Sequence, residues 1–239
     1  MDTALRQHYL DAMGITRWLP RHESSASLAL DSEIQISATE PSIVDDASSN
    51  SPVDIELAWQ TLEAEVSHCY NCVLSQTRLH TVFGSGNRHA DWMFIGEGPG
   101  QHEDEQGLPF VGPAGLLLTE MIRALGLNRE HVYIANIIKC RPPKNRDPHV
   151  DEIAACSHFL KRQIELVNPK IILAVGRIAA QTLLDTEQPL SKLRGQIHRL
   201  NEVPLIVVYH PAYLLRSLPE KRKAWQDLQL ALKTIGYKL

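Results

Sequence analysis

The chain has 239 residues, of which 44% are hydrophobic and 22% are charged, and its formal net charge is −4. This length is enough for one α/β core, with about 50 residues left over as a tail. No apolar run approaches the roughly 20 residues of a membrane-spanning helix, and the N-terminus lacks the apolar segment and cleavage site of a signal peptide. We therefore expect a cytoplasmic protein.

The acidic residues are concentrated in one part of the chain. Residues 22–77 contain ten Asp or Glu and no Lys or Arg, whereas residues 1–21 have a net charge of +1. Residues 78–239 carry 21 basic against 16 acidic residues. The body of the protein is therefore mildly basic, and its overall negative charge does not exclude a nucleic-acid partner.

Composition divides the chain into three regions. Residues 1–21 contain a short amphipathic helix, predicted at 3–19, which is marginal alone and is a candidate docking peptide. Residues 22–55 are rich in Ser, Ala and acidic residues and have no aromatic residue, so they are predicted to be a flexible linker. Residues 56–239 are predicted to form the folded domain.

Hydrophobic patterning predicts alternating helices and strands in the folded domain. The predicted strands are 92–95, 132–138, 170–175 and 205–209, and the predicted helices are 56–66, 114–125, 151–167, 176–184 and 220–235. This alternation predicts a mostly parallel central sheet between two layers of helices, which is a three-layer α/β/α domain.

A glycine-rich turn that carries one carboxylate follows the first predicted strand. Gly96, Gly98 and Gly100 leave the backbone bare enough to touch a ligand, and Glu97 lies among them. In open α/β sheets, ligands bind at the carboxyl ends of the strands. The three glycines are therefore candidate substrate-binding residues; the alternative is a tight turn with a solvated Glu.

Three parts of the chain carry distinctive motifs: GEGPG followed by GLPFVGPAG, then ANIIKCRPP, and then HPAYLLR. They resemble the motifs of the family 4 uracil-DNA glycosylases, the iron–sulfur members of their superfamily. The resemblance covers about residues 60–237, with the motifs in the family's order. It implies a uracil-DNA glycosylase fold and hydrolysis of the N-glycosidic bond of uracil, which starts base excision repair. In one departure, Gly98 stands where the family more often has Ala, which leaves the fine choice of substrate open.

Three polar residues at predicted strand ends are expected to meet at one edge of the sheet. The amide of Asn136 suits the imide edge of uracil. His210 is expected to donate a hydrogen bond to uracil O2, and Glu97 to stabilise the cationic sugar or to hold the attacking water. Phe110 resembles the family residue that stacks on the flipped base. The alternatives are a satisfied core Asn, a His that caps a strand end, and ordinary core packing of the Phe.

The catalytic candidates in these motifs include no lysine that could form a Schiff base, so a monofunctional glycosylase is expected. Glu103 and Asp104 are expected in a solvated loop, with a share in holding the water as the alternative. His198 is interpreted as structural.

An apolar and a basic group follow His210. Leu214 and Leu215 are candidates for a wedge that enters the DNA duplex, and Arg216 for a phosphate contact; the alternative is a helix whose leucines face the core. Further candidate phosphate contacts, with solvated surface charge as the alternative, are Arg141, Lys144, Arg146 and Arg194.

Four cysteines indicate a metal site. They are Cys69, Cys72, Cys140 and Cys156. Disulfides are not expected in a reducing cytoplasm, and the C-x-x-C spacing lets two thiolates face one metal. The resemblance implies that all four hold a structural [4Fe-4S] cluster. The alternatives are structural zinc and buried free cysteines.

The start of the chain has a resemblance of its own. Residues 5–21, LRQHYLDAMGITRWLPR, are similar to the N-terminal peptide of the psi subunit of the bacterial replicative clamp loader. This implies docking to the clamp loader while the linker lets the domain search DNA; the alternative is a helix that packs on its own body. The expected partners are uracil-containing DNA, single- or double-stranded, and the clamp loader, with the protein a monomer.

Two other functions compete with the enzyme. One is a non-enzymatic, DNA-binding accessory protein of the clamp loader. The other is a zinc-stabilised α/β protein that binds nucleotides.

Overall fold

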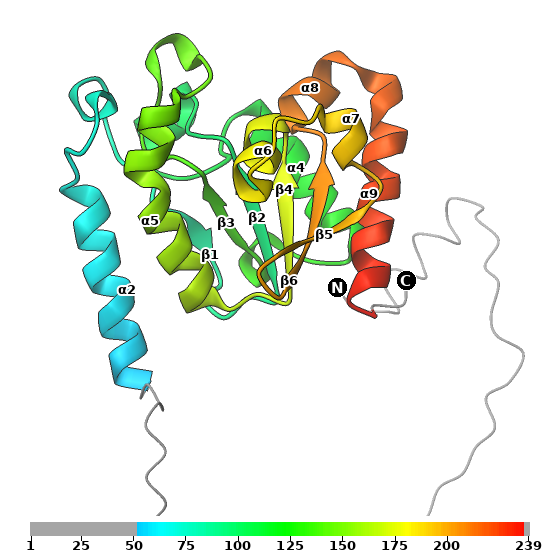
Figure 1. Cartoon of the computed structure of the whole chain (residues 1–239), viewed down its shortest axis with the longest axis horizontal. Coiled ribbons are helices and arrows are strands. Elements are labelled where there is room, and N and C mark those ends of the chain that lie inside the picture. Colours follow the sequence, from blue (N-terminus) through cyan, green and yellow to red (C-terminus); the bar gives the residue numbers. More distant parts are fainter. Residues whose placement is uncertain (1–51, 237–239) are drawn as a thin grey trace, which may run out of the picture. The chain divides into compact units, whose positions relative to one another are not determined.

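The computed structural model of the chain describes residues 52–236 (Figure 1). The predictions for residues 1–21, and for the linker up to residue 51, lie outside the described residues. The last four residues of the predicted linker are instead helical, since α2 spans Pro52–Ser67. A proline at the first helical position and Asp54 in the first turn explain the earlier start, because both favour a helix N-terminus.

The strands of the described region form one sheet in the order β1-β3-β2-β4-β6-β5. They are β1 (Ser85–Gly86), β2 (Trp92–Gly96), β3 (Tyr133–Asn136), β4 (Ile171–Val175), β5 (Ile197–Leu200) and β6 (Val203–Val208). The four central strands run parallel, and the edge strands β1 and β5 pair antiparallel. This confirms the mostly parallel sheet. The edge strands were not predicted, because β1 has two residues and β5 is half exposed.

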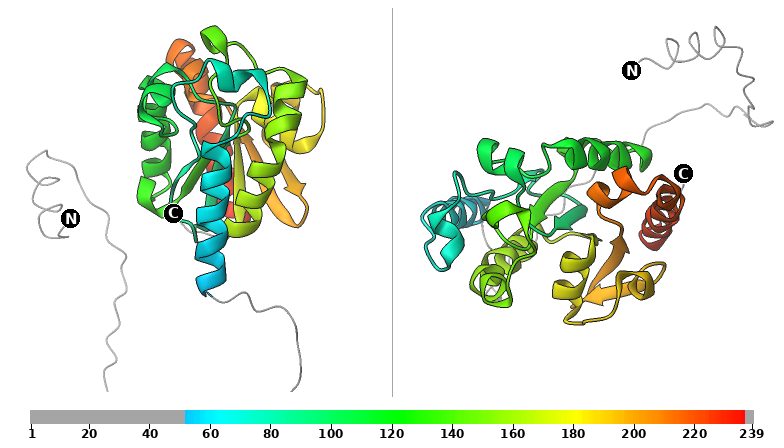
Figure 2. Two further views of the ribbon diagram at one scale, coloured as in Figure 1. Left: turned by 90° about the vertical axis from the view of Figure 1, so that its left-hand side faces the viewer. Right: turned by 90° about the horizontal axis from the view of Figure 1, so that it is seen from above.

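Helices cover both faces of the sheet (Figures 1 and 2). After α2 they are α3 (Gln101–Gln106), α4 (Pro113–Ala124), α5 (Val150–Val167), α6 (Arg177–Leu184), α7 (Leu190–Leu193), α8 (Pro211–Arg216) and α9 (Lys221–Thr234). Single helical turns are η1 (Val73–Gln76), η2 (Arg129–His131), η3 (Pro143–Asn145) and η4 (Leu218–Glu220). The three-layer α/β/α prediction is confirmed. No helix within residues 52–236 is long and apolar enough to cross a membrane.

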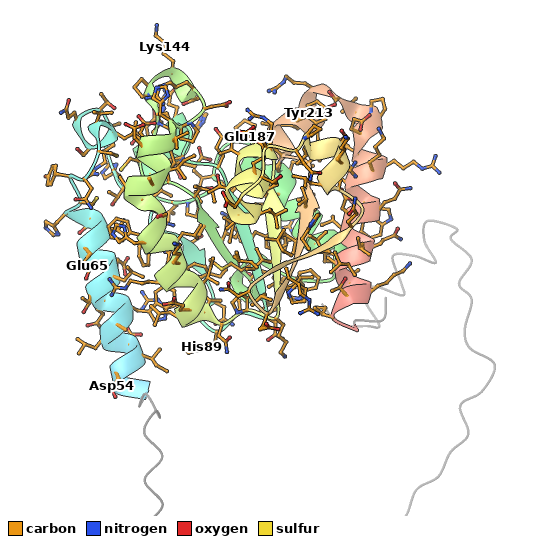
Figure 3. The ribbon with its side chains drawn as sticks, in the orientation of Figure 1. Asp54, Glu65, His89, Lys144, Glu187 and Tyr213 are labelled. Carbon is orange, nitrogen blue, oxygen red and sulfur yellow. The ribbon has the colours of Figure 1, made fainter. Side chains whose placement is uncertain are left out.

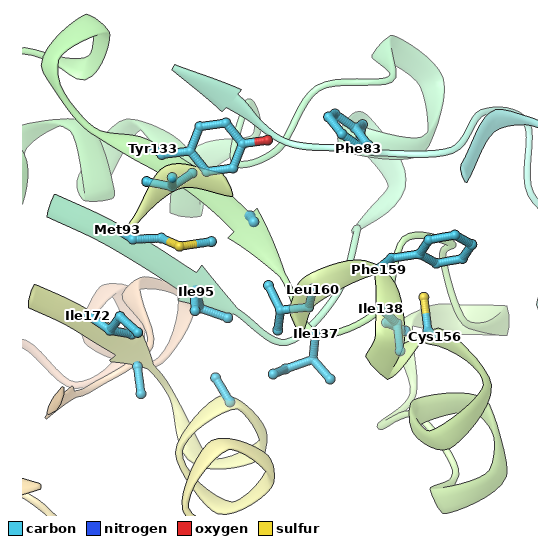
Figure 4. Close-up of a cluster of buried hydrophobic side chains, with 14 of the residues drawn as sticks. Phe83, Met93, Ile95, Tyr133, Ile137, Ile138, Cys156, Phe159, Leu160 and Ile172 are labelled. Atoms are coloured by element: carbon cyan, nitrogen blue, oxygen red, sulfur yellow. The ribbon is translucent and has the colours of Figure 1, made fainter. Parts of the chain in front are cut away.

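The strands divide their side chains between two cores, because successive residues of a strand point to opposite faces. In β2, Met93 and Ile95 pack with α2, α5 and α6, whereas Trp92 and Phe94 pack with α4, α8 and α9. Figure 4 shows the first core, with Cys156 beside Ile138. Full burial of each such side chain stabilises the fold by about 1.5–3 kcal/mol.

The connections place a crevice at the carboxyl edge of the sheet. The chain leaves β2 toward α4 on one face and leaves β4 toward α6 on the other. Because neighbouring strands β2 and β4 continue to opposite faces, their carboxyl ends leave a gap between them, which is where open α/β sheets bind ligands.

Candidate active site

A pocket of about 720 Å³ opens at the carboxyl ends of the parallel strands. Glu97 follows β2, Asn136 ends β3, and His210 follows β6. All three side chains, together with Phe110, line this pocket. The structure thus brings to one place the groups that the sequence analysis placed at three separate strand ends.

The glycine-rich turn has no Cβ atoms where the pocket walls come closest. A Cβ on Gly96 would lie 2.5 Å from Asn136 Oδ1 and 2.5 Å from Phe110 Cζ. A Cβ on Gly98 would lie 2.7 Å from Ile138 Cγ1. Gly96 therefore allows both the amide and the aromatic ring to lie against the turn, and the absence of the methyl at position 98 leaves room for a buried isoleucine.

Asn136 presents an acceptor to the pocket. Its side chain is 2% exposed, and Oδ1 has no hydrogen-bond partner among the described residues. An unpaired buried acceptor costs about 1–3 kcal/mol. This cost is recovered when a ligand brings an N–H donor to the atom, so the geometry differs from that of a satisfied core Asn.

Phe110 is held by a carboxylate that the sequence analysis had placed in a solvated loop. Glu103 accepts hydrogen bonds from the backbone N–H of Gly100 at 3.1 Å, and from those of Val111 and Gly112 at 2.9 Å each. It lies in α3, where a loop was expected. Glu103 thus joins the glycine-rich turn to the Phe110 segment, and the solvated-loop prediction is wrong for it.

A second clamp explains the unusual backbone of Phe110, whose φ is +51°. Such a conformation is strained for an aromatic residue and persists only where the surroundings impose it. The Arg129 guanidinium donates to the Pro109 carbonyl and to Thr119 Oγ1. A Cβ on Gly115 would lie 1.8 Å from the Phe110 carbonyl oxygen. The ring is therefore fixed, 5.8 Å from the His210 ring between centroids.

Asp104 is also wrongly predicted as solvated, because it is buried. Its Oδ1 accepts hydrogen bonds from the backbone N–H of Leu79 at 2.9 Å and of His80 at 3.4 Å. Asp104 thereby ties α3 to the segment that follows the first cysteine pair. Because Glu103 and Asp104 are adjacent in a short helix, they bind different segments. Glu103 holds the wall of the pocket, and Asp104 holds the segment after the cysteine pair.

Glu97 lies in a desolvated and charged environment. Burial, and to a lesser extent the nearby Asp147 carboxylate, raise its pKa to about 7 against the opposing effect of the Arg177 guanidinium. Asp147 and Arg177 line the same pocket and form an ion pair with 2.5 Å between Oδ2 and Nη2. This pair was not predicted from the sequence, although Arg177 follows the end of a strand, as Glu97 and His210 do.

His210 is neutral at physiological pH, and its tautomer follows from its contacts. Burial, and to a lesser extent the Arg216 guanidinium, lower its pKa to about 4 against the opposing effect of Glu103. The imidazole caps α8, with Nδ1 accepting a hydrogen bond from the Ala212 N–H at 3.2 Å. Because Nδ1 is an acceptor, the ring proton is on Nε2. The pocket therefore contains a neutral N–H donor.

Leu214, the first residue of the predicted wedge, is buried, so the wedge prediction is wrong for this residue. Leu214 is 1% exposed and packs in the core between α4 and α9, as the alternative of a helix facing the core describes. Leu215 is 44% exposed, and Arg216 is exposed and lines the pocket. The helical period of α8 decides which leucine points inward.

Two of the predicted phosphate contacts have structural partners. The Arg194 side chain is 10% exposed, and its Nη2 lies 2.5 Å from Asp227 Oδ2, so the prediction for Arg194 is wrong. Arg146 makes a bidentate ion pair with the buried Glu152. Lys144 is exposed and extends from the loop at the top of Figure 3.

Two further predicted residues are also engaged within the protein. Arg141 Nε donates to Asn145 Oδ1 at 2.7 Å, and its guanidinium lies 4.0 Å from the Asp104 carboxylate. His198 Nε2 hydrogen-bonds the Leu193 carbonyl at 2.7 Å, as a structural residue does.

The four cysteines line one small cavity between α2, η1, α5 and the loop after β3. None forms a disulfide. The Arg78 Nη1 donates to Cys140 Sγ at 3.1 Å, and the Lys139 backbone N–H donates to Cys156 Sγ at 3.3 Å. Burial raises the pKa of Cys140, and that of Cys156 to about 11, so an unligated site would hold neutral thiols.

The four thiols give this cavity an all-sulfur set of donors. Within residues 52–236, no three Cys, His, Asp or Glu side chains are gathered closely enough to hold one metal ion. Structural zinc needs four ligands about 2.3 Å from one point when all are thiolates. Four thiols around one cavity, with hydrogen-bond donors to two of the sulfur atoms, fit the ligand chemistry of an iron–sulfur cluster.

Lys139 connects the cysteine cavity to the pocket. Its buried Nζ donates to the Asn136 carbonyl at 2.9 Å and to Gln163 Oε1 at 2.5 Å, while its backbone N–H contacts Cys156. Burial lowers its pKa to about 8. This lysine lines the cysteine cavity and not the pocket, so it stabilises the end of β3 without reaching a ligand.

Comparison with known proteins agrees with this geometry. Residues 83–229 match the uracil DNA glycosylase superfamily. The chain is 46% identical to the type-4 uracil-DNA glycosylase of Thermotoga maritima over 180 residues, which are 74% of this chain and 94% of the relative. It is 43% identical to the Archaeoglobus fulgidus enzyme over 68% of this chain and 85% of the relative. For Sulfurisphaera tokodaii the identity is 44%, with coverages of 70% and 80%. The chain belongs to the type-4 uracil-DNA glycosylases.

Proposed function

We propose that the protein hydrolyses the N-glycosidic bond of uracil in DNA and so starts base excision repair. One observation carries the proposal: a carboxylate, an unpaired amide oxygen and a neutral imidazole meet in one pocket. The names of the type-4 relatives support uracil as the base.

The pocket binds an extruded base by its edge and its face. Asn136 Oδ1 accepts the N3–H of uracil, and the amide N–H₂ donates to O4. Cytosine reverses this pattern at both positions and is rejected. The Phe110 ring, held by Glu103 and Arg129, stacks on the base.

The reaction breaks the bond between C1′ of the sugar and N1 of uracil, and the electron pair leaves with the base. The His210 Nε2–H donates to uracil O2, where negative charge accumulates in the transition state. Glu97 stabilises the cationic sugar and accepts the proton of the water that adds to C1′. Within the described residues no lysine lines the pocket, so a Schiff base has no nucleophile and the glycosylase is monofunctional.

Release of free uracil from oligonucleotides tests the proposal. We expect the purified protein to release uracil from a uracil-containing strand and to leave a matched cytosine-containing strand intact. Protein that binds both strands and releases no uracil would instead be the non-enzymatic accessory protein of the clamp loader.

We propose further that the four cysteines hold a [4Fe-4S] cluster with a structural role. The cluster would draw η1, the loop after β3 and α5 together, and it supplies no step of the reaction. The shared cavity and the two hydrogen bonds to sulfur support this assignment.

Changing one ligand tests the cluster. Cys72→Ala is expected to remove most of the iron and the visible absorbance, because three thiolates hold the cluster weakly, whereas the anaerobically purified wild type contains about four iron atoms per chain. Ser75→Ala, at the lining of the same cavity, is the control and should keep its iron. One zinc per chain in a colourless wild-type protein would show structural zinc instead.

For DNA, we propose Leu215, Arg216 and Lys144 as contacts, since all three are exposed. Arg216 lies at the pocket, where it can pair with a phosphate beside the extruded nucleotide.

We also propose that residues 1–21 dock on the replicative clamp loader, on the basis of their resemblance to the psi peptide. Deleting residues 1–21 is expected to abolish capture of clamp-loader subunits by the immobilised protein and to leave uracil release from short oligonucleotides within twofold of wild type. Equal capture by the full and the shortened chain would contradict the docking role.

A further inference from the structure

The rim of the pocket presents the exposed ring of a tyrosine. Tyr213, on α8, is 40% exposed and lines the pocket with His210 and Phe110. Figure 3 shows Tyr213 at the same end of the molecule as Lys144. The catalytic proposal leaves this ring without a role.

Tyr213 is the outer member of a stack that is fixed from within. Its ring packs on that of Tyr209, with 5.1 Å between centroids and 40° between planes. On Tyr209 lies the Arg194 guanidinium, 4.0 Å from the ring centroid. Arg194 is in turn held by Asp227, with 2.7 Å from Nε to Oδ2. The series Asp227, Arg194, Tyr209 and Tyr213, which we call the tyrosine ladder, therefore begins at a buried ion pair and ends at an exposed ring.

This arrangement gives Arg194 a different function from phosphate binding. A guanidinium over the face of a tyrosine is attracted by the ring quadrupole, and the contact strengthens as water is excluded. Because Asp227 holds the Arg194 guanidinium in place, the Tyr209 ring that packs on it is also held in place. Tyr213, which packs on Tyr209, therefore loses little conformational freedom when a ligand covers it. An orientation set before binding lowers the entropic cost of stacking.

We propose that Tyr213 is a stacking platform for an unpaired base that neighbours the extruded uracil, a subsite that rests on the proposed function. Because Tyr213 lies at the rim of the pocket, a DNA strand that places uracil against Asn136 brings a neighbouring nucleotide close to this ring. Arg216 on the same helix supplies positive charge for its phosphates.

The chemistry of the platform indicates what it binds. Stacking on an aromatic ring tolerates any base, because every base has a π-face, and it contributes about 1–3 kcal/mol per base. A neighbouring base reaches Tyr213 only if it leaves its own stack. In a single strand this costs little, whereas in a duplex pairing and stacking must be broken first. The platform therefore favours uracil in single-stranded DNA.

The experiment measures binding of single strands that carry 2′-fluoro-deoxyuridine, a uracil nucleotide that resists cleavage, with 2-aminopurine at either neighbouring position. Wild-type protein is expected to quench the 2-aminopurine at one neighbour. Replacing that neighbour with an abasic residue should weaken binding about tenfold, within the range that base stacking contributes. Tyr213→Ala should show no quenching and should bind equally well with and without the neighbouring base.

Two further variants make the comparison specific. Tyr213→Phe keeps the ring and should restore the quenching and the dependence on the neighbouring base. Leu218→Ala removes an exposed apolar side chain outside the pocket and should behave as wild type. In turnover, Tyr213→Ala should raise KM about tenfold on single strands with little change in kcat.

The outcomes separate the two proposals. Wild-type protein that releases uracil, but binds equally well with and without the neighbouring base, would overturn the platform and leave the glycosylase intact. Loss of quenching in Tyr213→Phe as well as in Tyr213→Ala would also overturn it, because the hydroxyl and not the ring would then be responsible. A wild type that releases no uracil would instead refute the proposed function.

Discussion

Replacing His210 with alanine is expected to lower kcat for uracil release by about 100- to 1,000-fold, which is the usual effect of removing one donor to a developing oxyanion. His210 lines the pocket, and its ring proton is on Nε2 because Nδ1 accepts a hydrogen bond from the Ala212 N–H. Since the negative charge on O2 is largest in the transition state, the loss should appear in kcat far more than in DNA binding.

A matched variant separates catalysis from the cap of α8. His210→Asn retains a side-chain acceptor suited to an N-cap, so its Tm should stay near that of wild type, whereas His210→Ala loses the cap as well. Both variants should lose the same share of kcat, measured by single-turnover release of uracil. If His210→Asn kept wild-type turnover, or if both variants lost binding and turnover equally, the assigned role would be wrong.

The activity should rise with pH through about 7, because the role proposed for Glu97 requires a carboxylate and its pKa is raised to about 7. Below this pH the group is protonated and can neither accept a proton nor stabilise a cation. An ordinary glutamate would place the same acid limb near 4.3. His210 adds no limb in this range, because it remains neutral above about pH 4. The profile of kcat/KM, which reports the free enzyme, measures the prediction.

Neighbouring charges should move this limb in opposite directions. Asp147→Asn removes a charge that raises the pKa of Glu97, so the limb should move to lower pH. Arg177→Gln removes a charge that lowers it, so the limb should move to higher pH. Both residues are substantially exposed, and added salt should reduce both displacements.

Glu97→Gln should lower kcat by about 100- to 10,000-fold and abolish the acid limb. It should also raise the free energy of unfolding at pH 8 more than at pH 5, because the raised pKa in the folded state means that the ionised carboxylate destabilises the fold above that pKa. An acid limb that survives in Glu97→Gln would assign it to another group.

Most of the architecture could be predicted from local pattern. Predicted strands lie within two residues of β2, β3, β4 and β6, because continuous apolar runs between turns are typical of buried parallel strands. The convergence of Glu97, Asn136 and His210 followed from one rule, since parallel strands bring their carboxyl ends to one edge. The elements that were missed are short: β1, β5, α3 and α7 have too few residues for a period to be visible, and α8 was predicted only as an alternative.

The amino-acid sequence by itself determined the layered sheet, the positions of the chemical groups on it and the resemblance of their motifs, because each depends on residues a few positions apart. Only the tertiary structure decided which groups are free to act. Leu214 and Leu215 are adjacent, yet the packing of α8 on α4 buries one and exposes the other. Arg194 and Asp227 are 33 positions apart, and their contact turns a predicted phosphate ligand into the base of the tyrosine ladder. Contacts between distant segments depend on how helices are rotated against the sheet, and local pattern does not record that rotation.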